Sequence, residues 1–496
     1  MKHDLYDALI IGSGAGGAAA AYRLTRAGLN VLLLEKGSEL PTDGSTLDIE
    51  RVVHRGEFLS RESWRDGRGR SLQPEERFNV GGKTRWYGAA LLRYGAHEFA
   101  ADPAHQCAGW PIAYGDLESY YSECERLLGV RHFECEPDLA RILRRLAARA
   151  PEWRGQALPL GLMTGILNDR HEASHFDGFA SVGRLKSDAE SAFLQPIAGA
   201  SNFRLETQAE VVALLAQDND SRSIAGVRLR DGREFRARHT ILAAGALHSP
   251  RLLQRYLEEH RLADRLPMSR NVGRGLKLHL LTAMVAVTPA RQRDLLRKTT
   301  LLVNERFPHS SVQPLGFDGE LIGTLVPKLV PRWLANQVGS CAYGFFLQTE
   351  DGSDAANRVG ADAGDSRPIL DYDARRVAPA RREHRRFTRA FQLALLKAGF
   401  ISFTQRIGLN GTAHACGSLM TGADPATSVV DPRGAVHGLE SLYVVDGSVL
   451  PRSSRVNPSL TIFAWALRVA DLLAARQRAA PHAVPESRTE RDVALA

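Results

Sequence analysis

Short apolar runs alternate with more polar segments over the first forty residues of the chain. Residues Tyr6–Ile11 are mostly apolar and bounded by polar residues, which predicts a buried parallel strand. Small residues continue from there to Gly28 and predict a helix that ends at a glycine cap. A second apolar run, Val31–Leu34, predicts another buried strand. The order strand, helix, strand indicates an α/β domain with a mainly parallel sheet.

The turn between the first strand and the helix has the pattern G-x-G-x-x-G. Gly12 allows a tight turn, Gly14 lets a pyrophosphate approach the backbone, and Gly17 permits close packing of helix against strand. The helix begins near Ala15, and the free N–H groups at its N-terminus favour a phosphate. The spacing therefore predicts a Rossmann-like dinucleotide site.

An acidic residue, Glu35, follows the second strand directly and is itself followed by Lys36. Its carboxylate is placed to accept hydrogen bonds from adenosine ribose hydroxyls, and it disfavours the 2′-phosphate of NADP. We assign both residues to the cofactor site, although the fingerprint alone does not distinguish FAD from NAD.

A length of 496 residues predicts two or more domains, and 44% hydrophobic with 24% charged residues is typical of a soluble globular enzyme. No apolar run reaches the roughly 18 to 20 residues needed to cross a bilayer, so we expect no membrane insertion. The first strand begins too early to leave room for a signal peptide, which favours a cytoplasmic location. The sequence does not indicate an oligomeric state.

The net charge of +8 comes mainly from arginine, which is densest over residues 373–389. Phe387, Phe391, Leu395 and Ala398 follow helical spacing there, so we interpret this run as the solvated basic face of an amphipathic helix. We reject nucleic acid as a partner because no aromatic stacking platform or binding motif accompanies the run. The five cysteines have no C-x-x-C spacing, which indicates buried thiols rather than a zinc or iron–sulfur site.

Residues 171–175 read H-E-A-S-H, a literal match to the H-E-x-x-H metallopeptidase pattern. A third metal ligand at metzincin spacing would fall on position 181, which is Ser181. The motif also requires a helix, whereas Asp169 before it and Asp177 after it favour a loop. We therefore predict no metal site.

Several segments after the fingerprint carry a resemblance to one family. They are NVGGKTRWYGAALLRY at 79–94, TILAAGALHSPRLL at 240–253, NVGRGLKLHL at 271–280, HACGS at 414–418, LYVVDG at 442–447 and VNPSLT at 456–461. In this order they resemble the motifs of the glucose–methanol–choline (GMC) oxidoreductases. The loop near residue 80 and the helix-forming stretch Gly109–Val130 are most similar to bacterial sugar, gluconate and pyranose oxidoreductases.

The resemblance implies that His414 is the catalytic base and that Asn457 lies beside it at the reacting edge of FAD. An imidazole with a pKa near 6.5 suits the removal of a hydroxyl proton at neutral pH, and an amide suits the holding of the substrate oxygen. We interpret His279 as structural. The resemblance also places the following residues against the cofactor: Gly81, Gly82, Thr84, Val212, Ala244, Gly245, Asp446, Gly447, Asn457 and Ser459.

Some relatives bind FAD covalently through a histidine in the glycine-rich loop. Here Thr84 is followed by Arg85 and Trp86, so we predict FAD without a covalent bond. Two further local features are expected: a helix capped and begun by Ser249-Pro250, and an antiparallel excursion over Phe203–Arg238 with a hairpin turn at Asp231-Gly232.

The resemblance implies a discontinuous FAD-binding domain of residues 1–95, 180–285 and 405–496. An α+β substrate-binding domain with a mostly antiparallel sheet would come from residues 96–179 and 286–404. The polar, Pro-containing segment 476–496 reads as a disordered tail.

The expected reaction is oxidation of an alcohol, with hydride transfer to the flavin, on a sugar, glycoside or polyol. A steroid or apolar alcohol is the alternative substrate, and a redox-silent, FAD-containing cyanohydrin lyase is the alternative chemistry. The sequence leaves the electron acceptor open between oxygen, a quinone and a redox protein.

Overall fold

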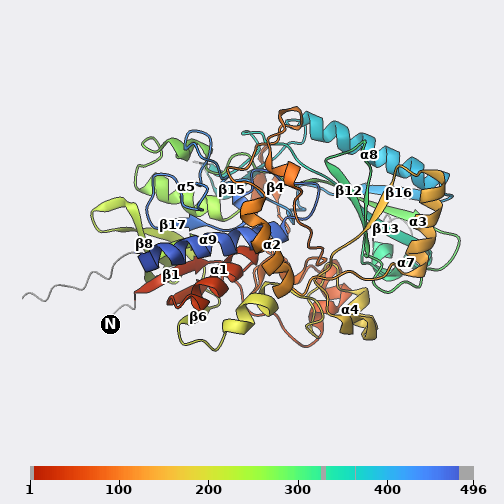
Figure 1. The fold of residues 1–496 in the computed structure, drawn as a ribbon, viewed down its shortest axis with the longest axis horizontal. Helices are drawn as coiled ribbons and strands as arrows, with labels where there is room; N and C mark the ends of the chain where they lie inside the picture. The colour runs from red at the N-terminus through yellow and green to blue at the C-terminus, as the bar shows by residue number, and fades with distance from the viewer. Residues whose placement is uncertain (1–4, 325–330, 363–364, 480–496) are drawn as a thin grey trace, which may run out of the picture.

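A computed structural model describes residues 5–324, 331–362 and 365–479. The molecule is elongated, with the N-terminal strands toward one end and helix α8 (Ala378–Lys397) toward the other (Figure 1). Each end is built around a β-sheet of its own. The architecture expected from the sequence, with one mainly parallel and one mostly antiparallel sheet, is therefore confirmed.

The sheet at the N-terminal end has seven strands in the order β6-β2-β1-β9-β8-β7, and β17 pairs with β9. Strands β6, β2, β1, β9 and β17 run parallel, whereas β7, β8 and β9 are antiparallel to their neighbours in the order β7-β8-β9. The antiparallel excursion expected over Phe203–Arg238 is therefore present from β7 onward but does not include β6, which pairs in parallel with β2. The strand bounds are β1 Tyr6–Ile11, β2 Val31–Leu34, β6 Phe203–Glu206, β7 Val211–Gln217, β8 Asp220–Leu229, β9 Glu234–Leu242 and β17 Leu442–Val444.

Helices pack on this sheet through small residues. In α1 (Ala15–Arg26) the four alanines Ala18–Ala21 are fully buried, which lets α1 lie against β1, β2 and the C-terminal helix α9 (Ser459–Ala479). Helix α2 (Gly115–Leu127), within the predicted helix-forming stretch, packs on α9. Helix α1 ends at Arg26, and Gly28 follows with a φ of 89°, the left-handed conformation that a glycine after a helix adopts readily.

The second sheet has six strands in the order β16-β10-β13-β12-β11-β5, and all its neighbours run antiparallel. Helix α8 covers one face and buries Phe387, Phe391 and Leu395, so the predicted amphipathic helix is confirmed. The strand bounds are β5 Arg154–Ala157, β10 Leu280–Val287, β11 Thr300–Val303, β12 Ser310–Pro314, β13 Ala342–Thr349 and β16 Ile401–Arg406.

A small third sheet, which the sequence did not suggest, has the order β14-β15-β3-β4. Its strands are β3 Trp64–Asp66, β4 Ser71–Leu72, β14 Arg358–Asp362 and β15 Asp365–Asp371. The remaining α-helices are α3 Pro137–Arg149, α4 Arg170–Ser174, α5 Ser249–Glu259, α6 Gly319–Thr324 and α7 Arg332–Ser340. Strands β10 and β16 cross the predicted domain boundaries at 285/286 and 404/405, and the division itself stays a prediction.

Three local expectations were wrong. The H-E-x-x-H segment forms the short helix α4, because Asp169 caps it by accepting hydrogen bonds from the N–H groups of His171 and Glu172. Ser249 does not cap α5, since it is the first helical residue and its hydroxyl bonds elsewhere. The disordered tail was predicted to begin at residue 476, whereas α9 extends to residue 479. Residues 480–496 lie outside the described part.

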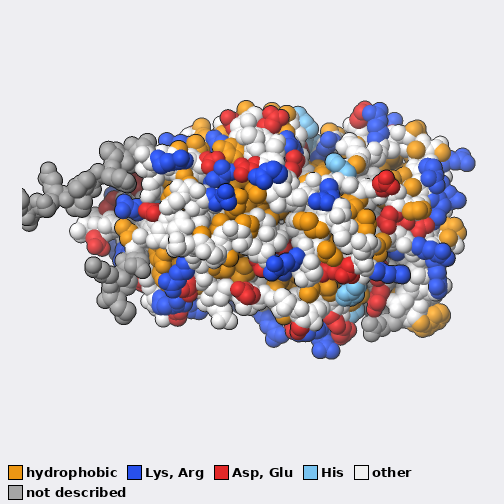
Figure 2. Space-filling model, turned by 60° about the horizontal axis from the view of Figure 1, so that its bottom comes forward, with side chains coloured by type: hydrophobic (Ala, Val, Ile, Leu, Met, Phe, Trp, Pro, Cys, Tyr) orange, Lys and Arg blue, Asp and Glu red, His pale blue; other side chains and the backbone are white. Residues whose placement is uncertain are grey.

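One face of the molecule carries both signs of charge. Figure 2 shows this face, on which Lys and Arg side chains are interspersed with Asp, Glu and apolar side chains. Among the described residues, none of the helices is long and apolar enough to cross a membrane.

Candidate active site

The glycine fingerprint packs tightly against itself and against the end of β9. At Gly12 φ is +101°, and a Cβ there would lie 2.5 Å from the carbonyl oxygen of Ala243. A Cβ at Gly17 would lie 1.8 Å from the carbonyl oxygen of Gly12, which is the close helix–strand packing predicted for this position. A Cβ at Gly14 would meet nothing within 4 Å, so this backbone faces open space as a phosphate site requires.

Glu35 is buried at the end of β2 and is anchored by the fingerprint turn. Its Oε2 accepts hydrogen bonds from the N–H (3.0 Å) and hydroxyl (2.6 Å) of Ser13, and its Oε1 accepts one from the N–H of Gly37 (2.9 Å). Burial raises the pKa of this carboxyl group. A second lone pair on Oε1 can accept a ribose hydroxyl. The adjacent Lys36 ammonium lies 3.0 Å from Glu210 and also pairs with Glu62.

The glycine-rich loop near residue 80 touches the fingerprint directly. The N–H of Gly81 donates to the Ser13 hydroxyl (3.1 Å), and a Cβ at Gly82 would lie 3.0 Å from the Cα of Gly14. The Thr84 hydroxyl donates to the Gly81 carbonyl (2.6 Å) and accepts from the N–H of Ala189 (3.0 Å). Thr84 therefore shapes the loop with its hydroxyl rather than leaving it free for a ligand.

Asp446 joins the ends of β9 and β17. Its Oδ2 accepts from the N–H of Gly245 (2.9 Å) and the hydroxyl of Ser249 (2.5 Å), and its Oδ1 accepts from the N–H (2.9 Å) and hydroxyl (2.5 Å) of Ser448. Four donors leave this buried carboxylate little capacity for a ligand, and burial raises its pKa. Asp446 thus holds the two cofactor-side turns together.

One cavity of about 1160 Å³ connects the fingerprint to the predicted catalytic residues. This exceeds the roughly 300–1,000 Å³ of typical small-ligand pockets and suits a dinucleotide plus a substrate. Of the predicted site residues, Gly17 and Gly81 support the turns without lining it. Those that line it are Gly12, Gly14, Ala15, Glu35, Lys36, Gly82, Thr84, Val212, Ala244, Gly245, His414, Asp446, Gly447, Asn457 and Ser459.

His414 and Asn457 meet in the cavity from segments that are 43 residues apart. The Asn457 amide nitrogen lies 3.3 Å from Nε2 of His414. The amide oxygen of Asn457 accepts a hydrogen bond from Nε2 of Gln313 (2.6 Å), a buried residue of β12. Because Gln313 occupies the amide oxygen, the amide NH₂ of Asn457 is turned toward the imidazole.

His279 lies on the other side of His414. Their Nδ1 atoms are 3.0 Å apart, and the rings are nearly perpendicular at 82°. Burial lowers the pKa of His279, and burial followed by the nearby His279, Lys298 and Lys83 lowers the pKa of His414 well below its usual value. Both imidazoles are therefore neutral at pH 7.

Two further polar side chains line the cavity. The Lys298 ammonium lies 2.8 Å from Oδ2 of Asp177, and the same oxygen accepts from the N–H of Gly316 (3.0 Å). Sequence reasoning missed Lys298, Asp177 and Gln313 because they lie in segments without a recognisable motif. No signal along the chain separates them from other buried polar residues.

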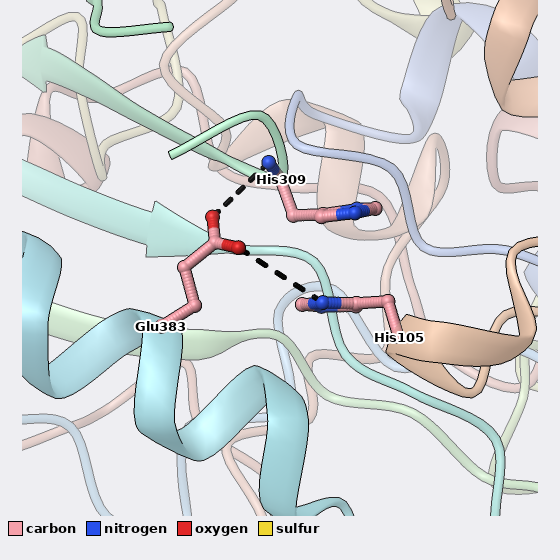
Figure 3. A group of neighbouring side chains, drawn as sticks. All are labelled: His105, His309 and Glu383. Carbon is pink, nitrogen blue, oxygen red and sulfur yellow. Dashed lines mark hydrogen bonds and ion pairs between the residues drawn. The ribbon is translucent and has the colours of Figure 1, made fainter. Parts of the chain in front are cut away.

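A second cluster of titratable groups lies between residues 102 and 383. Within residues 5–324, 331–362 and 365–479, side chains near enough to share a metal ion are His105, His309 and Glu383 (Figure 3). A second such group, Cys107, His309 and Glu350, shares His309 with the first.

The geometry of this second cluster is that of an ion-pair network rather than a metal site. The rings of His105 and His309 stack 3.7 Å apart and 11° from parallel, so their in-plane lone pairs cannot point at one ion. Nδ1 of His309 lies 2.7 Å from Glu350, and Nε2 lies 3.1 Å from Asp102. Burial opposes charge here, but the hydrogen bond to Glu350 raises the pKa of His309. Because both ring nitrogens of His309 face carboxylate oxygens, neither presents a lone pair to a metal ion.

Comparisons with known proteins agree with this site. A model described as GMC oxidoreductase matches residues 355–466, and one described as FAD dependent oxidoreductase matches residues 7–296. Two relatives are 6‴-hydroxyparomomycin C oxidase of Streptomyces lividus (31% identity) and paromamine 6′-oxidase of Streptomyces fradiae (29%), each covering 95% of this chain and 91% of the relative.

The fold also matches a solved structure. Pyridoxine 4-oxidase from Mesorbium loti superposes with a TM-score of 0.69 at 18% identity, over 94% of this chain and 99% of that one. The segments matched by the two family models include both the dinucleotide fingerprint and the His414 region. The chain therefore belongs to the GMC oxidoreductase family, and it is an FAD-dependent enzyme that oxidises the CH–OH group of an alcohol.

Proposed function

We propose that His414 removes the hydroxyl proton of the substrate and that Asn457 holds the substrate oxygen. The observation that carries this proposal is the meeting of the His414 imidazole and the Asn457 amide, 3.3 Å apart, in the cavity that also contains the dinucleotide fingerprint. A neutral imidazole can accept a proton, and an amide NH₂ can donate to the alcohol oxygen as it becomes negative.

The residues that line the cavity fit FAD. The open backbone at Gly14 and the N-terminus of α1 would hold the pyrophosphate, and Glu35 would hold the adenosine ribose. When bound, FAD supplies the acceptor for the hydride that leaves the carbinol carbon.

We propose that FAD is bound without a covalent link. Arg85, which follows Thr84, is engaged by Asp188 (3.0 Å) and Glu190, and the indole N–H of Trp86 donates to Asn79 (2.9 Å). These side chains therefore support the loop. Denaturing the yellow protein with acid should release all flavin into the supernatant, and flavin that stays with the precipitate would contradict this.

The substrate we propose is an amino sugar, such as an aminoglycoside, that is oxidised at one of its hydroxyl groups. Both relatives are named for aminoglycosides, and each aligns over 91% of its length. The Asp177 carboxylate and Lys298 ammonium, together with Gln313, provide polar groups in the cavity for such a ligand. Placement within the bacterial sugar and gluconate dehydrogenase branch remains a prediction.

The test is anaerobic mixing of the holoenzyme with a panel of alcohols. We expect the flavin absorbance near 450 nm to bleach with an aminoglycoside, and more slowly with neutral sugars. Faster bleaching with a sterol or a long-chain alcohol would favour the apolar-alcohol alternative. Product release without bleaching would indicate lyase chemistry and overturn the proposal.

The electron acceptor is tested with the same protein. Both relatives are named oxidases, so we propose oxygen as the acceptor. Admitting air to the reduced enzyme should restore the flavin colour and so complete one turnover. One molecule of hydrogen peroxide should form for each substrate molecule oxidised. Slow reoxidation by air with fast reoxidation by a quinone would contradict this assignment.

A further inference from the structure

His279, which contacts His414, and Ser454, which contacts His279, have a backbone conformation that residues other than glycine rarely adopt. His279 has a φ of 62° and Ser454 a φ of 66°. These two residues are joined to each other, because Nε2 of His279 lies 2.7 Å from the carbonyl oxygen of Ser454. A non-glycine residue in the left-handed region is strained, so the surrounding structure must impose this geometry.

Buried carboxylates impose it at Ser454. Its hydroxyl donates to Oε1 of Glu98 (2.6 Å), and its N–H donates to Oε1 of Glu350 (3.2 Å). Glu350 is fully buried and is held by the Arg452 guanidinium at 2.8 Å and 2.6 Å. The Ser454 carbonyl is therefore a fixed acceptor.

The hydrogen bonds define where each proton lies. A carbonyl oxygen can only accept, so Nε2 of His279 carries a hydrogen and donates to Ser454. Because His279 is neutral, its Nδ1 has a lone pair and must accept from Nδ1 of His414, 3.0 Å away. His414 is also neutral, which leaves the lone pair on Nε2.

The contacts of Asn457 agree with this assignment. Its amide oxygen is occupied by Gln313, so its NH₂ group lies 3.3 Å from Nε2 of His414 as a donor. A donor on that side requires a lone pair on Nε2. Contacts from both sides of the ring thus select the same tautomer.

We propose that His279 is a positioning residue that fixes His414 in the tautomer with its lone pair on Nε2, on the side of Asn457. This inference rests on the proposed role of His414 as the base. His279 acts through His414, and its hydrogen bond to Ser454 determines which of its own nitrogens accepts.

Two substitutions separate this role from packing. His279→Phe keeps an aromatic ring but has no acceptor. His279→Asn carries an oxygen near the position of Nδ1, and asparagine tolerates a positive φ. We expect His279→Phe to lower the rate of flavin reduction about 100-fold and His279→Asn to stay within about tenfold of the wild type, at equal FAD content. Equal rates for the two variants would overturn the proposal.

The tautomer can be read without catalysis. In FAD-loaded protein labelled with ¹⁵N-histidine, His414 is assigned by the signals that disappear in His414→Gln. In the wild type we expect His414 to have a protonated Nδ1 and an unprotonated Nε2. In His279→Phe we expect His414 to be a mixture of the two tautomers. A proton on Nε2 in the wild type would overturn the proposal even if no alcohol bleaches the flavin. If the tautomer is as expected but no alcohol bleaches the flavin, the proposed function alone fails. Should His279→Phe not fold, the wild-type spectrum still decides.

Discussion

The two ends of the cavity differ in the atoms that form them: one is formed by backbone turns and the other by side chains. At the fingerprint end, backbone turns at Gly12, Gly14 and Gly82 approach one another so closely that a Cβ at Gly12 or Gly82 would lie within 3.0 Å of another segment's backbone. At the oxidation end, the contacts are between the side chains of His279, His414, Asn457 and Gln313. We therefore expect substitutions at the first end to act by blocking space, and substitutions at the second end to act by moving a proton.

The largest effect is expected at Gly17. In Gly17→Ala the new methyl group would lie 1.8 Å from the Gly12 carbonyl oxygen, so the fingerprint turn must open, at a cost of about 3 kcal/mol. We expect protein purified without bound flavin and without activity. Gly199→Ala, where a Cβ meets nothing within 4 Å, is the matched control and should keep its flavin. A yellow, active Gly17→Ala enzyme would break the comparison.

The second largest effect is expected at His414, at the oxidation end of the cavity. His414→Ala removes the proposed base, and general-base catalysis contributes about 10² to 10⁴-fold in rate. Anaerobic stopped-flow should show flavin reduction slowed by that factor, while the ratio of flavin to protein stays that of the wild type. Loss of flavin in this variant would mean that the two ends are not separable.

The dependence on pH sharpens the assignment of the base. Because burial lowers the pKa of His414, the imidazole stays unprotonated from neutral pH down past its usual value of about 6.5. Flavin reduction should be constant over that range and fall about tenfold per pH unit only at more acidic pH.

The same pKa shift predicts a change in stability. Below about pH 6.5 the unfolded chain binds a proton at this residue that the folded protein does not, so the free energy of unfolding should decrease as pH is lowered. Urea titrations of wild type and His414→Ala at two pH values test this, because the variant should lose less stability on acidification. A larger loss in the variant would contradict the lowered pKa.

The smallest effect is expected at Gln313. Gln313→Leu removes the donor that orients the Asn457 amide, a hydrogen bond worth about 1 kcal/mol, so kcat/KM should fall roughly fivefold. Gln156→Leu, on the exposed strand β5 of the same sheet, makes the same chemical change away from the cavity and should leave kcat/KM unchanged. Equal effects from the two substitutions would mean that Asn457 needs no orientation.

Much of the fold follows from local patterns. The bounds of β1 and β2 agree with the apolar runs because each strand is buried along nearly its whole length. The failure at α4 has a local cause, since Asp169 acts as a helix cap although aspartate is also a turn former. The third sheet was missed because β3 and β4 are only three and two residues long, too short for any periodicity.

The sequence alone determined the fingerprint turn of the nucleotide end, because that turn is made by glycines and small residues that are neighbours along the chain. It also predicted His414 and Asn457 as catalytic residues, through motifs that resemble those of a family. Only the tertiary structure bears on which nitrogen of His414 would act as the proposed base, because that depends on His279, Ser454 and Gln313, which lie up to 175 residues apart. A tautomer is set by the partners that surround a ring, and residues distant in the chain become partners only when the sheets pack together.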